Sequence, residues 1–227
     1  MTQALNDEYC AGLWRNELVT TELCWSGDRH RNTTNLPTVG SGTYRAPSWS
    51  WACQDGPITP FDTRLPTEIL PRIEITECNV KTATSDRTGA VTSGELRVSG
   101  WLATLQAYPR NPGDPLDLFF NGKRLQVVYE KCIVIDYTLS SSQLHFLPVQ
   151  VRKPIRVLNE GLCWIVSGLL LIPTGAARGQ FWRVGTFSFP ISDLALTDQE
   201  ELSNLVNEPW MEYETDCGDG KYITSII

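Results

Sequence analysis

The chain has 227 residues, of which 41% are hydrophobic and 20% are charged, a composition typical of globular proteins rather than disordered or fibrous ones. Its formal net charge is −7 and its basic residues are dispersed. A nucleic-acid partner is therefore not expected, because phosphate binding needs a clustered basic face. The length allows one large domain, and we treat residues 1–227 as a single β-rich domain.

The N-terminal segment from Asp7 to Trp25 places Leu13, Trp14 and Leu18 at helical spacing, which predicts a short amphipathic helix. Residues 26–43 are rich in Gly, Asn, Thr and Pro without periodicity, and they predict a mobile loop. The first residues lack a basic stretch followed by an apolar one, so no signal peptide is predicted and a cytoplasmic location is expected.

Alternation of apolar and polar residues predicts β-strands through the middle of the chain. The dipeptide Asn121-Gly122 supplies the positive φ angles of a two-residue hairpin turn. A second hairpin is predicted around Gly175 and Gly179, with the apolar run that precedes it as a buried strand, too short to cross a membrane. The predicted strands lie within 71–82, 94–108, 116–130, 131–139, 161–173 and 179–189.

Near the C-terminus, Thr197 and Glu200 have the spacing of a capping box and predict a short acidic helix. The tail 218–227 is compatible with a last strand. The expected fold class is therefore mainly β: a single-domain barrel or sandwich of antiparallel strands with a short helix near each end.

Seven cysteines and two histidines show no metal-ligand spacing, so neither a metal site nor a cofactor is expected. The cysteine number is odd and no CxxC pair occurs, which favours free, mostly buried thiols. His145, between Leu144 and Phe146, is interpreted as a structural residue rather than a base. No nucleophile elbow supports a Ser/His/Asp triad.

The most unusual stretch is YRAPSWSWACQDGPI, from Tyr44 to Ile58. If it is extended, Trp49 and Trp51 point to one face and the serines between them to the other. The two rings could form a core pair, or one could line an apolar cavity. Six further tryptophans add flat apolar surface, among them Trp25, Trp101 and Trp182.

Three charged residues accompany these rings. Arg45 and Asp55 flank the tryptophans and are interpreted as an ion pair that fixes the loop, or as two solvated charges. Arg183 follows Trp182 on a predicted strand and could face either a cavity or water. A buried arginine there would need a partner, and would suggest an anion or carbonyl ligand.

Four motifs in the same order resemble the region that follows the heterokaryon-incompatibility (HET) domain of fungal proteins. They are YCAGLW (9–14), LCW (23–25), YRAPSWSWACQDGPI (44–58) and GLLLIPTGAARGQFWRVGTF (168–187). The resemblance covers nearly the whole chain, but the HET domain would precede YCAGLW and Met1 lies only a few residues upstream. Incompatibility signalling is therefore not carried over, and a function of its own is expected.

A second resemblance, to fungal hetero-Diels–Alder cyclases that join a polyketide quinone methide to a macrocyclic terpene, suggests the leading functional hypothesis. It is a cofactor-independent cyclase of specialised metabolism with hydrophobic small-molecule substrates, in which shape does most of the catalysis. The expected hydrogen-bond donors to a carbonyl oxygen are Arg183, Arg45 and Tyr44, and the expected substrate-binding residues are Trp49, Trp51, Trp182, Trp25 and Trp101. The alternatives are a non-catalytic interaction module derived from a HET-domain protein and, ranked last, a hydrolase with an unconventional nucleophile. Oligomeric state is left open.

Overall fold

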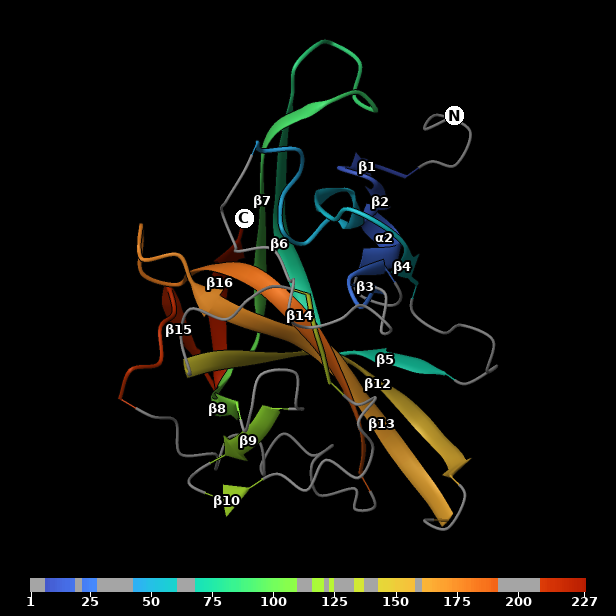
Figure 1. The fold of residues 1–227 in the computed structure, drawn as a ribbon, viewed down its shortest axis with the longest axis vertical. Coiled ribbons are helices and arrows are strands. Elements are labelled where there is room, and N and C mark those ends of the chain that lie inside the picture. The colour runs from blue at the N-terminus through green and yellow to red at the C-terminus, as the bar shows by residue number, and fades with distance from the viewer. Residues whose placement is uncertain are drawn as a thin grey trace.

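The computed structural model places strands along most of the chain that it describes (Figure 1). The described residues are 7–18, 22–27, 43–60, 68–109, 116–120, 123–124, 133–136, 143–157, 161–191 and 209–227. The expected mainly β class is confirmed. Within this described part, no helix has the length and apolar character to span a membrane.

Three long strands, β12 (Gln143–Val157), β13 (Gly161–Pro173) and β14 (Gln180–Ile191), form the centre of the sheet and cross the molecule diagonally in Figure 1. The predicted hairpin between β13 and β14 is confirmed. Gly175 and Gly179 have φ angles of +73° and +75°, the left-handed region that glycine adopts without a Cβ clash. The apolar run of 161–173 is therefore a strand, as expected.

Successive residues of these strands enter two separate hydrophobic clusters. In β13, Leu169 and Leu171 belong to one cluster, while Leu170 and Ile172 belong to the other. Side chains alternate across a strand, so the two clusters lie on opposite faces of the sheet. A strand buried on both faces needs a continuous apolar run, which is why this segment does not alternate with polar residues.

The remaining strands extend the sheet on both sides. The hydrogen-bonded order is β10-β9-β8-β12-β13-β14-β16-β7-β6, while β11, β15 and β5 pair with β14, β16 and β12. This order is an open path, so the described strands form no closed barrel and fit the sandwich-like alternative. The added strands are β5 (Ile69–Pro71), β6 (Ile73–Thr82), β7 (Val91–Trp101), β8 (Ala103–Pro109), β9 (Leu116–Phe120), β10 (Lys123–Arg124), β11 (Ile133–Ile135), β15 (Thr215–Gly218) and β16 (Lys221–Ile226).

Two local predictions are confirmed by strand register. Phe120 of β9 pairs with Lys123 of β10, which leaves the predicted two residues for the connection. The C-terminal tail forms β16, which pairs antiparallel with β7 and parallel with the first residues of β14. The acidic helix expected from Thr197 lies outside the described residues.

The N-terminal helix expected over Asp7–Trp25 is wrong for its first half. The chain there forms a hairpin of β1 (Tyr9–Cys10) and β2 (Leu13–Trp14), and α2 (Arg15–Glu17) follows as a short helix. Ala11 and Gly12, with φ angles of +48° and +100°, make the turn. Positive φ at two successive residues is the geometry of a tight hairpin, and it interrupts helical spacing.

This N-terminal segment covers one face of the central sheet. Cys10, Leu13, Leu18 and Leu23 pack in the same cluster as Leu169 and Leu171. After them β3 (Ser26–Gly27) pairs with β4 (Ile58–Thr59). The loop predicted over 26–43 is therefore wrong for its first two residues, and its residues 28–42 lie outside the described part.

The pairing of β11 with β14 depends on Gly185, because a Cβ there would lie 2.2 Å from the carbonyl oxygen of Val134. We expect Gly185→Ala to lower the free energy of unfolding by about 1–3 kcal/mol, the usual cost of overpacking. Gly175→Ala is the control: nothing lies within 4 Å of its Cβ, and its positive φ alone costs about 1–2 kcal/mol. Urea denaturation measures the free energy of unfolding of both variants, and the near-UV circular dichroism spectrum reports whether side-chain packing has changed. A Gly185 variant with unchanged near-UV signal and stability would refute the close approach.

Candidate functional site

The Tyr44–Ile58 stretch is not an extended strand. Trp49 lies in a turn and is fully buried, and a short 3-10 helix, η3 (Trp51–Cys53), begins two residues later. Trp51 is 41% exposed. The expectation that the two rings share a face is therefore wrong, because the turn and the helix replace the period of two.

Two serine hydroxyls produce this geometry. The Ser50 Oγ accepts a hydrogen bond from the Ala52 N–H at 3.1 Å, which caps η3, and donates to the carbonyl of Ala11. The Ser48 Oγ donates to the carbonyl of Ile227 and accepts from the backbone N–H of Arg183 at 2.9 Å. The stretch is thus fastened to the β1–β2 turn, to the C-terminus and to β14.

Arg183 is completely buried on β14, which answers the question of its direction. Its Nη1 donates to the Asp136 Oδ2 at 2.8 Å, and its Nη2 donates to the carbonyl of Trp25. The guanidinium also lies 3.5 Å from the centre of the Trp25 ring, in cation–π geometry. The anion and the carbonyl that a buried arginine requires are therefore supplied by the chain itself.

Asp136 is the partner of Arg183, and no sequence pattern indicated this pair. It follows β11 directly, its backbone N–H donates to the Val184 carbonyl at 2.8 Å, and its Oδ1 accepts from the Gly27 N–H at 2.9 Å. A Cβ at Gly27 would lie 2.8 Å from that oxygen, so the position favours glycine. An acid at the end of a strand usually suggests a solvated loop, and only the isolated apolar run Ile-Val-Ile before it hints at burial.

Trp25 joins this ion pair to the opening stretch. Its Nε1 donates to the carbonyl of Trp49 at 2.9 Å, and both side chains are buried. The structure therefore brings together three of the predicted site residues, Trp25, Trp49 and Arg183. The Nε1 of Trp49 and the Nε of Arg183 have no hydrogen-bond partner within the described residues.

A thiol and an amide lie beside this group. Cys24 is buried, and burial raises the pKa of its thiol to about 12, against the opposing effects of Arg183, Gln150 and Arg152. Gln150, on β12, is fully buried, and its side chain lies beside the Cys24 thiol. Its amide has no nitrogen or oxygen partner among the described residues, which is uncommon for a buried amide, so Gln150 marks a polar position under the N-terminal segment.

The other predicted donors lie on the surface. Arg45 forms an ion pair with Asp55 at 2.8 Å and donates to the carbonyl of Cys53 at 3.2 Å, which confirms the interpretation as a loop-fixing pair. Tyr44 is 49% exposed, and partial burial raises the pKa of its hydroxyl. Trp51 donates from its Nε1 to the carbonyl of Gly12 at 2.8 Å.

The two remaining tryptophans belong to other parts of the sheet. Trp182 is half-buried and packs against the cluster that contains Leu170 and Ile172, the face opposite to Arg183. Trp101 is buried at the end of β7, where it pairs with Lys221 of β16. Neither has a recorded contact with the buried ion pair among the residues described.

His145 has the structural role that was expected. Its side chain is fully buried, its Nε2 accepts from the Glu212 N–H at 3.0 Å, and the rings of Phe181 and Trp210 pack against it. Burial lowers its pKa to about 4. The imidazole is therefore neutral at physiological pH and its acceptor nitrogen is already used.

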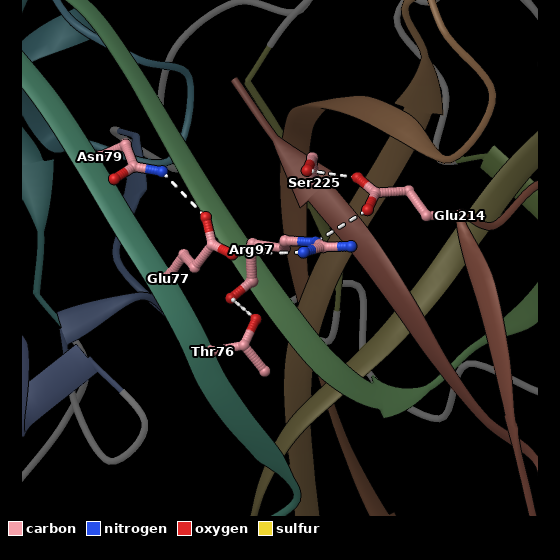
Figure 2. Close-up of polar contacts among 6 residues, drawn as sticks. All are labelled: Thr76, Glu77, Asn79, Arg97, Glu214 and Ser225. Atoms are coloured by element: carbon pink, nitrogen blue, oxygen red, sulfur yellow. Dashed lines mark hydrogen bonds and ion pairs between the residues drawn. The ribbon is translucent and has the colours of Figure 1, made fainter.

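A second charged group lies at the surface of β6, β7 and β16 (Figure 2). Arg97 donates to the Glu214 Oε2 at 2.8 Å and to the Glu77 Oε1 at 3.2 Å, while Ser225 donates to Glu214. Glu214 is thus held against the sheet. Because every carboxylate here has a cationic or hydroxyl partner, the group fastens strands and offers no free base.

The described residues contain no group of His, Cys, Asp and Glu that could hold a metal ion. None of the five cysteines whose side chains the structure describes forms a disulfide, as expected: Cys10 and Cys24 are buried, Cys53 and Cys78 are half-buried and Cys217 is exposed. His30 lies outside the described residues.

Comparison of the chain with protein-family models, with curated proteins and with solved structures finds no match in any of the three.

The buried ion pair predicts a large and non-additive loss of stability. Asp136→Asn leaves the Arg183 guanidinium buried without an anion, and we expect a loss of about 3–5 kcal/mol. Arg183→Met with Asp136→Leu should lose less than the sum of the two single variants, because no unpaired charge remains. The exposed pair is the matched control, since Arg45→Met should cost about 1 kcal/mol or less. Additive losses in urea denaturation would contradict the direct coupling.

His145 predicts a pH dependence of stability. Its folded pKa of about 4 lies below the ordinary value of 6.5, so the unfolded chain binds the proton more readily between these values. This contribution to the free energy of unfolding is fully present above pH 6.5. It is lost as the pH falls towards 4, and the total loss is about 3 kcal/mol. His145→Gln keeps an acceptor for the Glu212 N–H and should flatten this part of the curve. If the free energies of unfolding of the native chain and of His145→Gln fell in parallel from pH 7 to 4.5, His145 would not be the group that titrates with folding.

Proposed function

We propose that this chain is a non-catalytic interaction module that binds a protein partner through three exposed side chains of one stretch, Tyr44, Arg45 and Trp51, which we name the aromatic patch. The observation that carries the proposal is that these three side chains are exposed, although they come from a stretch whose backbone is fastened to the rest of the fold. The buried residues of the same stretch are committed to internal contacts.

The residue types of the patch favour a protein partner. Trp, Tyr and Arg are the residues most enriched among those that dominate binding energy at protein interfaces. Two of the three are already oriented: Trp51 by its hydrogen bond to the Gly12 carbonyl and Arg45 by Asp55. Side chains ordered before binding lose less conformational entropy in the complex, which leaves more of the contact energy for affinity.

The position of the patch suggests which partner to test first. Trp51 packs against the β1–β2 turn, where a Cβ at Gly12 would lie 3.2 Å from its ring. The turn belongs to the YCAGLW motif, and in the proteins that this chain resembles the HET domain joins on that side. A HET domain is therefore the first candidate partner, and its surface would meet the patch beside the hairpin.

A second candidate function is the cofactor-independent cyclase, and Gln150 is the observation that favours it. A fully buried amide beside the Cys24 thiol, with no nitrogen or oxygen partner in the described part of the chain, is chemically suited to a substrate carbonyl. Holding a heterodiene against an alkene in that position would supply about 7–11 kcal/mol through proximity alone. The Arg183 guanidinium argues against the cyclase and so favours the interaction module, because two of its nitrogens already bind Asp136 and the Trp25 carbonyl.

Trp51→Ala and Tyr44→Ala test the patch. With a purified fungal HET domain as the probe, we expect each variant to weaken binding by about 30-fold in titration calorimetry, the loss of an interface residue worth about 2 kcal/mol. Tyr108→Ala is the matched control, since Tyr108 is 47% exposed on β8 and should leave affinity unchanged.

Equal affinity of all variants, or no binding by the native chain, would overturn the patch as a HET-domain site. The same preparations, incubated with a polyketide quinone-methide precursor and a macrocyclic terpene beside a boiled control, distinguish the cyclase. Product formed by the native chain and lost in Gln150→Leu, with Trp51→Ala unaffected, would establish the second candidate instead.

A further inference from the structure

Two cysteines face one another where the N-terminal hairpin meets the sheet. Strand β1, which contains Cys10, lies against β6, which contains Cys78. Cys10 is 1% exposed and belongs to the core cluster, and Cys78 packs against that cluster from the half-buried side of β6. The two thiols lie close enough for each to shift the pKa of the other. Both are free in this structure.

The two sulfurs are chemically unequal. The hydrogen bond from Cys10 lowers the pKa of Cys78, against the opposite effect of burial. The same hydrogen bond, together with burial, raises the pKa of Cys10. Cys78 is also the more accessible of the two, so the thiolate forms on the sulfur that a small oxidant can reach.

We propose that Cys78 and Cys10 form an oxidation site for small peroxides, with Cys78 as the attacking thiolate and Cys10 as the resolving thiol. The arrangement has the features of redox-sensing cysteines: an accessible thiolate next to a second cysteine. The proposal is independent of the interaction module, because it involves neither the aromatic patch nor the buried ion pair.

The chemistry balances with hydrogen peroxide as the named oxidant. The Cys78 thiolate attacks one peroxide oxygen, the O–O bond breaks, and Cys78 becomes a sulfenic acid while hydroxide leaves and takes up a proton as water. The Cys10 sulfur then attacks the Cys78 sulfur, the S–O bond breaks, and a second water leaves with the Cys10 proton. The two sulfurs lose two electrons in total and the peroxide gains them.

The disulfide would fasten the β1–β2 hairpin to β6. It would close a loop that contains β3, β4, β5 and the Tyr44–Ile58 stretch, because all of these lie between the two cysteines in the chain. Cross-linking a long loop restricts the unfolded chain more than the folded one. Oxidation is therefore expected to stabilise the position of the N-terminal segment on the sheet.

The full-length protein, treated with hydrogen peroxide and then with an alkylating reagent, tests the site by peptide mass spectrometry. We expect a Cys10–Cys78 linked peptide, removed by dithiothreitol, and a rise in Tm of about 5–10 °C for the oxidised chain. Cys10→Ser should instead accumulate a sulfenic acid at Cys78 that dimedone traps. Cys217→Ser is the control, because Cys217 is exposed on β15 and its loss should leave the link unchanged.

Two results would overturn the proposal. One is oxidation of Cys217 under conditions that leave both Cys10 and Cys78 alkylated, which would show that ordinary exposure decides reactivity. The other is dimedone labelling of Cys78 in the native chain without any linked peptide, which would show that Cys10 does not resolve the sulfenic acid. If Cys10→Ser fails to fold, Cys10→Ala provides the same sulfenic-acid readout.

Discussion

A guanidinium without solvent contact joins three separate segments of this chain. Arg183 comes from the central strand β14, Asp136 from the end of β11, and the Trp25 carbonyl from the segment that covers the sheet. The desolvation of such a charge costs several kcal/mol unless all of its partners are in place. The three segments must therefore assemble together, and the ion pair selects one arrangement of the N-terminal segment over other apolar contacts.

The hydroxyls of the opening stretch extend the same constraint. Ser48 accepts from the backbone of Arg183 and donates to Ile227, so it ties the stretch to the strand that holds the ion pair and to the C-terminus. Ser50 ties it to the β1–β2 turn. The two serines, which a period of two would place on a polar face, are the residues that decide the fold of this stretch. Polar side chains that bind backbone groups compete with strand formation, and here they prevail.

The β13–β14 hairpin and the β9–β10 connection could be predicted because their signals are local, whereas the central strand β12 lies outside the predicted strands. Gly175 and Gly179 mark the β13–β14 turn, and the two-residue connection after Phe120 follows from Asn-Gly. The N-terminal hairpin could not be predicted in this way, since Leu13 and Leu18 satisfy helical spacing equally well and a positive φ at Ala11 leaves no trace in the sequence. The partner of Arg183 also depends on a contact between residues 47 positions apart, which no local pattern encodes.

The distribution of the aromatic residues follows from the same assembly. Trp49 enters the core because the turn after Pro47 directs it inward, and Trp51, two residues later, remains partly exposed because Ser50 begins η3. Burial of one ring and presentation of the other are thus two results of one backbone geometry. Since Ser48 connects that geometry to Arg183, the exposed ring is held by a network that reaches the buried charge. The backbone that carries Trp51 is therefore ordered during folding, before any contact with another molecule.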